Sequence, residues 1–233
     1  LTERENRNVF RDPSASQEMR NEVAALNKLA KQLDQTEKTI RTCRSLQIDE
    51  EVRRFREQLA CVRSSPTEAV KPLVPLLDEM EKKYAMFGGD PIINSWKAVR
   101  WCLDHGLIQS ALTMLEENAV TAICRAFSLD ERKEEVRNDI HSTIQIVLRR
   151  IPKDKWRVHS VELVERMTEV LHSYREELKP FGGVKELRND INHAGTRPKP
   201  MAAEKFMPKT VALFEQFSSF FEQMSMLAKS MSK

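Results

Sequence analysis

The chain contains few of the residues that interrupt helices. Only 6 of its 233 residues are glycine and 6% are aromatic, whereas 40% are apolar. Leucine, glutamate, lysine, arginine, methionine and alanine dominate the composition, and all are strong helix formers. A chain of this length and apolar content can bury a sizeable core. The composition therefore predicts an all-α protein.

Cysteine and long apolar runs are also scarce. None of the four cysteines forms a C-x-x-C pair or stands at zinc-ligand spacing from a histidine. Cys102 and Cys124 lie in apolar stretches, which predicts two buried thiols. Free thiols fit a reducing compartment, so we expect a cytoplasmic location. No apolar run approaches the roughly 20 residues of a membrane span, and no signal peptide is apparent, so we expect no membrane partner.

Charge of one sign is not in excess, because 38 basic and 35 acidic residues leave a net charge of +3. That balance does not by itself indicate a nucleic-acid-binding protein, although it allows a local basic patch. The sequence has no carboxylate cluster at metal-ligand spacing, no glycine-rich phosphate loop and no serine nucleophile motif. It therefore predicts no metal and no cofactor.

Apolar periodicity predicts about eight or nine helices and no strand. Residues 19–40 carry a heptad-like apolar stripe, and Asp90-Pro91 combines a helix N-cap with proline at the first helical position. Residues 107–127 form the most apolar helix and are expected at the centre of the core. A helix is expected to begin at Asp130.

The last third of the chain is punctuated by proline and glycine. Pro180 and Gly182-Gly183 are expected to close one helix, and a short helix is expected from Val184 to about His193. A final helix, rich in phenylalanine and methionine, is expected from near Pro208. Its aromatic residues suit the core, a dimer interface or a surface for a partner, and the sequence leaves these alternatives open.

The tetrapeptide RNDI occurs twice, at residues 137–140 and 188–191, each time with a histidine close behind. In the first copy, Arg137 and His141 are four residues apart, so they share one face of a strongly periodic helix. His141 borders the apolar face of that helix, and Asn138 and Asp139 are expected to point to solvent. The first copy is therefore interpreted as an ordinary amphipathic helix.

The second copy differs in spacing. Arg188 and His193 are five residues apart, which leaves their side chains roughly 140° apart around an ideal helix. They meet only if the helix ends at the histidine or if two chains contribute one pair each. Ala194-Gly195 predicts such a helix end, and Asn192 tolerates the backbone angles found there.

Arginine and histidine together suit one chemistry, the metal-free cleavage of RNA. A neutral imidazole can take the proton of a 2′-hydroxyl, and a guanidinium can hold the scissile phosphate. The need for a 2′-hydroxyl excludes DNA as a substrate. Lys185 and Arg197 make the neighbourhood of the second copy basic, so they are candidates for RNA binding together with Asn192.

The surroundings of the second copy resemble a known family. RNDINHAGTR, residues 188–197, resembles the R-x(4–6)-H motif of HEPN ribonucleases. Residues 101–124, followed by LRNDINHAG, are similar to the helical C-terminal domain of CRISPR-associated CARF–HEPN proteins, and residues 71–87 also suit that family. By this resemblance Arg188 and His193 match the catalytic pair and Asn189 matches the polar position after the arginine.

The resemblance implies a homodimer in a prokaryotic cytoplasm, in which two motifs form one composite site. That site cleaves single-stranded RNA without metal and leaves a 2′,3′-cyclic phosphate or a 3′-phosphate. Such enzymes serve type III CRISPR antiviral defence, where cyclic oligoadenylate binds a CARF domain and activates the nuclease. The chain has no α/β segment suited to a CARF domain and begins at Leu1, so we expect an excised nuclease region or a protein without its sensor.

Two predicted parts follow from the resemblance. Residues 1–66 are interpreted as a linker and helical connector, and residues 67–233 as a HEPN-like helical bundle with nuclease activity. A catalytically silent HEPN-type scaffold, which binds RNA or nucleotide or mediates dimerisation, is the alternative. A purely structural helical protein is the third interpretation.

Overall fold

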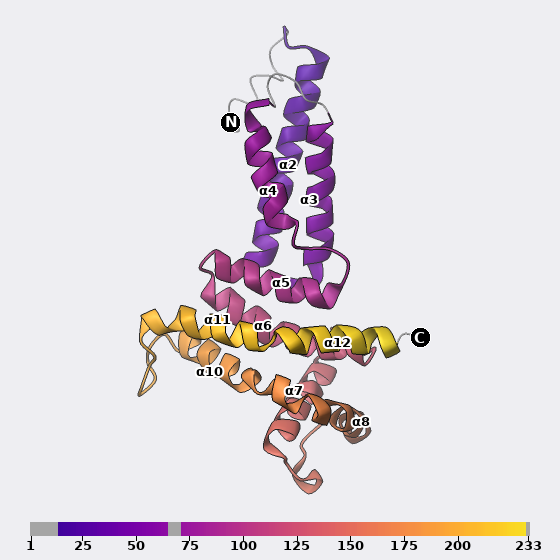
Figure 1. Ribbon diagram of the computed structural model, residues 1–233, viewed down its shortest axis with the longest axis vertical. Coiled ribbons are helices and arrows are strands. Elements are labelled where there is room, and N and C mark those ends of the chain that lie inside the picture. The colour runs from indigo at the N-terminus through magenta and orange to yellow at the C-terminus, as the bar shows by residue number, and fades with distance from the viewer. Residues whose placement is uncertain (1–13, 65–70, 232–233) are drawn as a thin grey trace. The chain divides into compact units, whose positions relative to one another are not determined.

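The structure, a computed structural model, describes residues 14–64 and 71–231 (Figure 1). These residues are helical almost throughout, and no strand occurs among them, which confirms the predicted all-α class. Single residues separate α9 (Arg175–Leu178) from α10 (Pro180–Asn192) and α11 (Phe206–Gln216) from α12 (Ser218–Met231). With each of these pairs counted as one helix, the described part of the chain has nine, as predicted.

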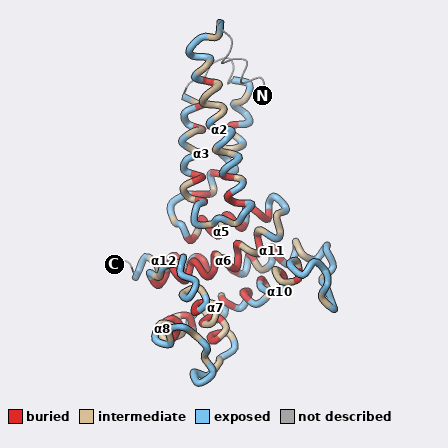
Figure 2. Tube along the Cα trace, turned by 180° about the vertical axis from the view of Figure 1, so that it is seen from behind, coloured by how far each residue is buried: buried red, intermediate tan, exposed pale blue. Residues whose placement is uncertain are grey.

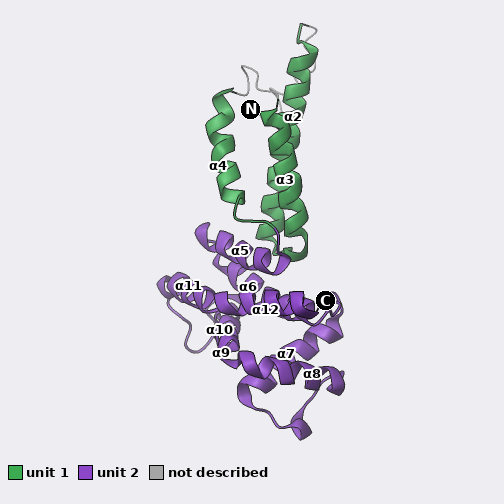
Figure 3. Cartoon of the chain, turned by 45° about the vertical axis from the view of Figure 1, so that its right-hand side comes forward, with its two compact units in different colours: residues 1–88 green, residues 89–233 purple. Residues whose placement is uncertain are grey.

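The chain divides into two compact units, residues 1–88 and 89–233 (Figure 3). In the first unit α2 (Gln17–Arg41) packs against α3 (Ile48–Arg63), and α3 packs against α4 (Val74–Tyr84). The Tyr84 ring lies 4.7 Å from that of Phe55, centroid to centroid, which ties α4 to α3. The sequence placed α4 with the nuclease part by a boundary between residues 66 and 67, whereas the compact units divide after residue 88.

The second unit is built around one central helix, α6 (Ile108–Ala126). It packs against α10, α11 and α12 and also against α5 (Pro91–Asp104) and α7 (Glu134–Arg149). Buried residues run along nearly its whole length (Figure 2), as the apolar pattern predicts. The remaining helix of this unit, α8 (Val161–Leu171), packs against α7. Short 3₁₀ turns occupy Ser45–Gln47, Lys71–Leu73, Lys153–Lys155, His172–Tyr174 and Ala203–Lys205.

The local signals at helix starts have mixed outcomes. The Asp90 carboxylate accepts hydrogen bonds from the backbone N–H groups of Ile92 and Ile93, at 2.9 and 3.2 Å, so the predicted N-cap of α5 is confirmed. The helix expected from Asp130 begins four residues later, at Glu134, because residues 130–133 form a turn closed by the Lys133 N–H and the Asp130 carbonyl.

The helix boundary expected at residues 180–183 is confirmed only in part: α9 ends at Leu178, just before Pro180, but the next helix begins at Pro180 and not at Val184. Pro180 is the first residue of α10, where the missing backbone N–H is not needed for a helical hydrogen bond. Gly182 and Gly183 therefore lie inside α10. A Cβ atom at Gly183 would lie 2.9 Å from Leu213 Cδ2, so glycine at this position lets α10 approach α11 closely.

The aromatic residues of the last two helices belong to the core of one chain. Phe214, Phe217, Phe220, Phe221 and Met224 are each at most 1% exposed. They are therefore covered without a second chain, and the core is the alternative that the structure supports. Cys102 and Cys124 are also fully buried, as predicted. None of the helices in the described ranges is both long enough and apolar enough to span a membrane.

Candidate functional site

The two RNDI copies converge on α6, in the second unit. Arg137 of α7 donates from Nη2 to Glu117 Oε2 at 2.7 Å and from Nη1 to the Thr121 hydroxyl at 3.1 Å. Arg188 of α10 lies with Nη1 2.9 Å from Glu116 Oε2 and 3.4 Å from Glu117 Oε1. Glu117 thus binds the arginine of both copies, although the two copies belong to different helices.

The aspartates of the two copies also have matching roles. Asp139 is only 2% exposed, and its carboxylate accepts from the backbone N–H groups of His159 and Ser160 at 2.7 and 2.9 Å. Asp190 is 6% exposed and accepts from the backbone N–H of Met201 at 2.8 Å. Each aspartate anchors the loop that follows its helix by binding backbone donors that have no helical partner.

The expectation of solvent-exposed polar residues in the first copy holds for only one of the two. Asn138 is exposed, whereas Asp139 is buried. The periodicity of α7 places Asp139 away from the main apolar stripe, but the segment before α8 folds over it and supplies two backbone donors. The arrangement of that segment is a tertiary feature, which helical periodicity does not contain.

Glu116 and Arg188 form the most buried ion pair of this site. Glu116 is 3% exposed, and burial raises the pKa of its carboxyl group, with the positive charge of Arg188 acting in the opposite direction. The two side chains attract each other as an ion pair but do not form a hydrogen bond, since Glu116 Oε2 has no hydrogen-bond donor. Arg188 Nε is likewise buried without an acceptor, so the guanidinium keeps an unused donor.

The end of α10 matches the prediction. The last helical residue is Asn192, and His193 caps the helix by donating its backbone N–H to the Asn189 carbonyl at 3.0 Å. Ala194 and Gly195 follow with φ of 49° and 75°, in the left-handed region that terminates helices. The His193 side chain is exposed and makes no hydrogen bond or ion pair with any residue that the structure describes. It is therefore free to contact a ligand.

The remaining predicted site residues are distributed around α10. Asn189 is half-buried, and Asn192 is exposed, its side-chain oxygen accepting from Gln109 Nε2 at 3.3 Å. Arg197 lines a pocket of about 650 Å³ between α10 and the segment that leads to α11. Lys185 lines a different pocket, of about 340 Å³, beside α7. The two cations predicted to bind RNA thus lie in separate pockets.

The α10–α11 pocket, which contains Arg197, is predominantly basic. Its cationic residues are Arg197, Lys199, Lys205 and Lys209. Glu186 and Asp190 also line it, but the Asp190 carboxylate already accepts a hydrogen bond from the Met201 backbone. Four cations against two carboxylates give this surface a positive character that suits a phosphate backbone.

Glu116 and Glu117 are the site residues that were not predicted. Two adjacent glutamates interrupt an otherwise apolar helix, and a carboxylate on a buried helix requires a cation or hydrogen-bond donors nearby. That rule could have indicated arginine partners for both residues. It could not have indicated which arginines, because the two that bind Glu117 lie 71 and 20 residues from it in the sequence.

Comparison of the chain with known proteins identifies no relative: no family model, curated protein or solved structure matches it. The HEPN resemblance therefore rests on the motif residues and their order along the sequence. Within residues 14–64 and 71–231, no group of three or more histidine, cysteine, aspartate or glutamate side chains is placed to hold a metal ion.

Proposed function

We propose that the protein is an endoribonuclease that cleaves single-stranded RNA without a metal ion. In this proposal a homodimer forms the composite active site, and each chain contributes Arg188 and His193. The observation that carries the proposal is the end of α10, where the exposed His193 caps the helix beside a basic pocket. Asn189 is assigned to the same site by its place in the motif.

The chemistry divides between the two side chains. The His193 imidazole, when neutral, takes the proton of the 2′-hydroxyl, whose oxygen attacks the adjacent phosphorus. The bond from phosphorus to the 5′-oxygen of the next nucleotide breaks, and that oxygen takes up a proton. The products are a 2′,3′-cyclic phosphate and a 5′-hydroxyl end. The Arg188 guanidinium balances the negative charge that develops on the phosphoryl oxygens.

The position of Arg188 explains why a second chain is part of the proposal. Its guanidinium is directed at Glu116 and Glu117 of α6, whereas His193 lies at the exposed end of α10. Because two carboxylates of the same chain hold Arg188 away from the exposed helix end, the proposal takes the arginine and the histidine that act on one phosphate from two chains. Two copies that meet near the helix end bring an arginine and a histidine to each side of the substrate.

Substrate binding is assigned to the exposed groups around the helix end. Asn192 directly precedes His193, whereas Arg197 follows it by four residues and belongs to the basic α10–α11 pocket. Lys185 extends the basic surface along α10. Activation by cyclic oligoadenylate through a CARF domain, and a role in type III CRISPR defence, belong to the same proposal by family resemblance. No residue of this chain is assigned to that step.

The test is cleavage of fluorescently labelled single-stranded RNA in excess EDTA. We expect His193→Ala to lower the cleavage rate by about 10²–10⁴-fold, the usual contribution of a general base. Arg188→Lys keeps the counter-charge for Glu116 but loses the planar guanidinium, so we expect a large loss of rate without a loss of folding. His172→Ala and Arg149→Ala are matched controls, because both residues are exposed in the second unit and outside the site.

Three results would refute the proposal. They are the absence of cleavage by the folded chain, cleavage that persists in His193→Ala, and cleavage of an all-deoxy strand at a similar rate. Light scattering tests the composite site separately, since a monomer at the concentrations that support cleavage is incompatible with two contributing chains.

A second candidate function is supported by the ion pairs of Arg188. Two carboxylates already bind this guanidinium, and they compete with a phosphate for it. In a catalytically silent HEPN-type scaffold, Arg188 only joins α10 to α6, and the basic surface binds RNA or nucleotide without cutting. RNA binding that is unchanged in His193→Ala, together with no cleavage, would identify this function.

A further inference from the structure

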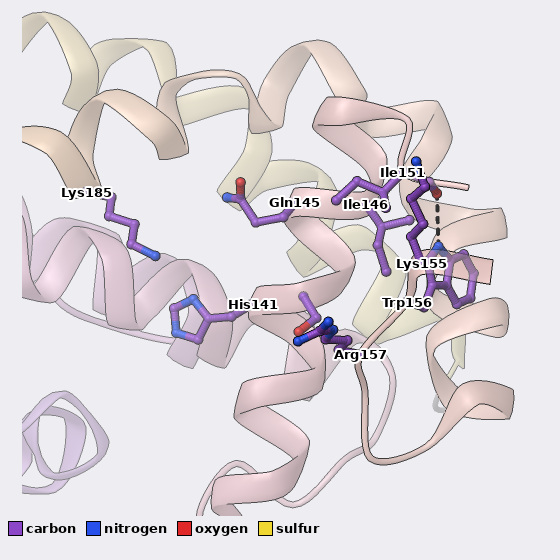
Figure 4. Close-up of a pocket in the computed structure, with 9 residues that line it drawn as sticks. His141, Gln145, Ile146, Ile151, Lys155, Trp156, Arg157 and Lys185 are labelled. Carbon is purple, nitrogen blue, oxygen red and sulfur yellow. Dashed lines mark hydrogen bonds between the residues drawn. The ribbon is translucent and has the colours of Figure 1, made fainter. Parts of the chain in front are cut away.

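A pocket separate from the end of α10 lies beside the first RNDI copy. Three segments line it: α7 with His141 and Ser142, the loop before α8 with Lys155 and Arg157, and α10 with Lys185. We call it the α7–α10 pocket, and Figure 4 shows the side chains that border it. Its volume is about 340 Å³, which lies at the lower end of the range for small-molecule sites.

The pocket gathers three cations, and the nearby acids lie outside its lining: Glu117 opposes the lowering of the His141 pKa by burial, and Lys185 opposes the raising of the Glu116 pKa by burial. Lys155, Arg157 and Lys185 are exposed, and no aspartate or glutamate is among the residues that line the pocket. Within the described ranges, none of these three side chains makes a hydrogen bond or ion pair. By contrast, Lys153 in the same loop pairs with Glu165. Three unpaired cations around one depression attract a multiply charged anion.

Part of the pocket lining is apolar, and its aromatic ring is held in place. Trp156 Nε1 donates to the Ile151 carbonyl at 2.9 Å, so the polar edge of the indole is satisfied within the protein. The rest of the ring and the Ile146 and Ile151 side chains offer apolar area to a ligand. A simple inorganic anion does not contact such an apolar surface. A ligand that carries both a phosphate and a ring contacts the cations as well as the apolar surface.

Polar groups that can both donate and accept hydrogen bonds also line the pocket, and in Figure 4 His141 and Gln145 lie between Lys185 and Trp156. The His141 ring is half-buried, and burial lowers the pKa of its imidazole, so the neutral form dominates near neutral pH. A neutral imidazole has one donor and one acceptor, and the Ser142 hydroxyl and the Gln145 amide have both as well. These groups suit ribose hydroxyls or the edge of a base.

We propose that the α7–α10 pocket binds a nucleotide, with its phosphate among Lys155, Arg157 and Lys185 and its base against Trp156. The size of the pocket limits the bound unit to about one nucleotide, either free or as part of an RNA strand. The proposal makes no use of Arg188 or His193, so it does not depend on the catalytic pair, although Lys185 is also assigned to RNA binding in the proposed nuclease.

The test is a titration of the full-length chain with AMP, followed by tryptophan fluorescence and by calorimetry. We expect AMP to quench Trp156 and to bind at least about tenfold more tightly than inorganic phosphate, ribose 5-phosphate or adenosine, because each of these lacks one half of the ligand. Trp156→Phe should abolish the quenching, while Trp96 and Trp101 keep their emission. A short single-stranded RNA that competes with AMP would assign the site to a nucleotide of the strand, and no competition would assign it to free nucleotide.

Single substitutions distinguish AMP binding in the pocket from nonspecific attraction of AMP by surface charge. Lys155→Ala and Arg157→Ala should each raise the Kd for AMP about tenfold, because each removes one charge-assisted contact. Lys153→Ala is the matched control and should leave the Kd unchanged, since Lys153 does not line the pocket. These side chains are exposed, so the melting temperature should not change.

Equal affinity for AMP and inorganic phosphate would overturn the proposal, because it would reduce the pocket to an anion site. An equal effect of Lys153→Ala and Lys155→Ala would overturn it as well. His193→Ala should bind AMP with the wild-type Kd. In the wild-type chain, AMP binding without cleavage would show that the proposed nuclease function has failed, whereas cleavage without AMP binding would show that the α7–α10 pocket proposal has failed.

Discussion

The aspartates of the two RNDI copies provide the sharpest test of the structure, because the same sequence position makes different contacts in the two copies. Asp139 accepts from two backbone N–H groups and lies 3.1 Å from His159 Nδ1, whereas Asp190 accepts from one backbone N–H. In addition, Asp190 Oδ1 is buried without a donor. The two aspartates should therefore differ in their contribution to the free energy of unfolding.

The magnitude follows from the number of hydrogen bonds. A net hydrogen bond to a charged group contributes about 1.5–3 kcal/mol, so Asp139→Ala should lower the free energy of unfolding by roughly 3–5 kcal/mol. Asp190→Ala removes one such bond and also an unsatisfied buried oxygen, so its cost should be only about 1–2 kcal/mol. For a domain of this size, the Asp139 change corresponds to a fall in melting temperature of about 10 °C.

The assay is urea unfolding of the full-length chain followed by tryptophan fluorescence. All three tryptophans lie in the second unit, at positions 96, 101 and 156, so the signal reports the unit that contains both aspartates. Asn138→Ala is the matched control, because Asn138 is exposed on the same helix and should change stability by less than about 0.5 kcal/mol. A cost for Asp190→Ala equal to that for Asp139→Ala would refute the assignment of these loop contacts.

Two further predictions concern α7 and α10. Burial holds the pKa of His141 below its value in the unfolded chain, so the folded chain binds fewer protons. The free energy of unfolding should therefore rise as the pH increases from the lowered pKa to about 6.5. In a series of urea midpoints against pH, His141→Gln should flatten this part of the profile. Parallel profiles for the two proteins would contradict this. The new Cβ of Gly182→Ala meets nothing within 4 Å, so this variant should stabilise α10 by roughly 0.5 kcal/mol. The new Cβ of Gly183→Ala must displace Leu213, so this variant should be stabilised less. Thermal melts of the two variants check which has the higher melting temperature.

Much of the fold could be predicted because its signals are local. The apolar stripe of residues 19–40 became α2, Asp90 became the N-cap of α5, and the apolar stretch around residues 107–127 became the central helix. The break expected at Gly182-Gly183, which is absent, shows the limit of such signals. Two adjacent glycines weaken a helix, but here both lie inside α10, where Gly183 lets α10 approach α11 closely.

The candidate site divides in the same way. The sequence by itself determined that α10 ends after Asn192 and that His193 is left at its end, because helix termination is encoded by the next two residues. Only the tertiary structure decided that the arginines of both RNDI copies bind Glu117 and that Asp139 is buried. The reason is physical, since helical periodicity specifies which face a side chain occupies, whereas its partner depends on which distant helix packs against that face.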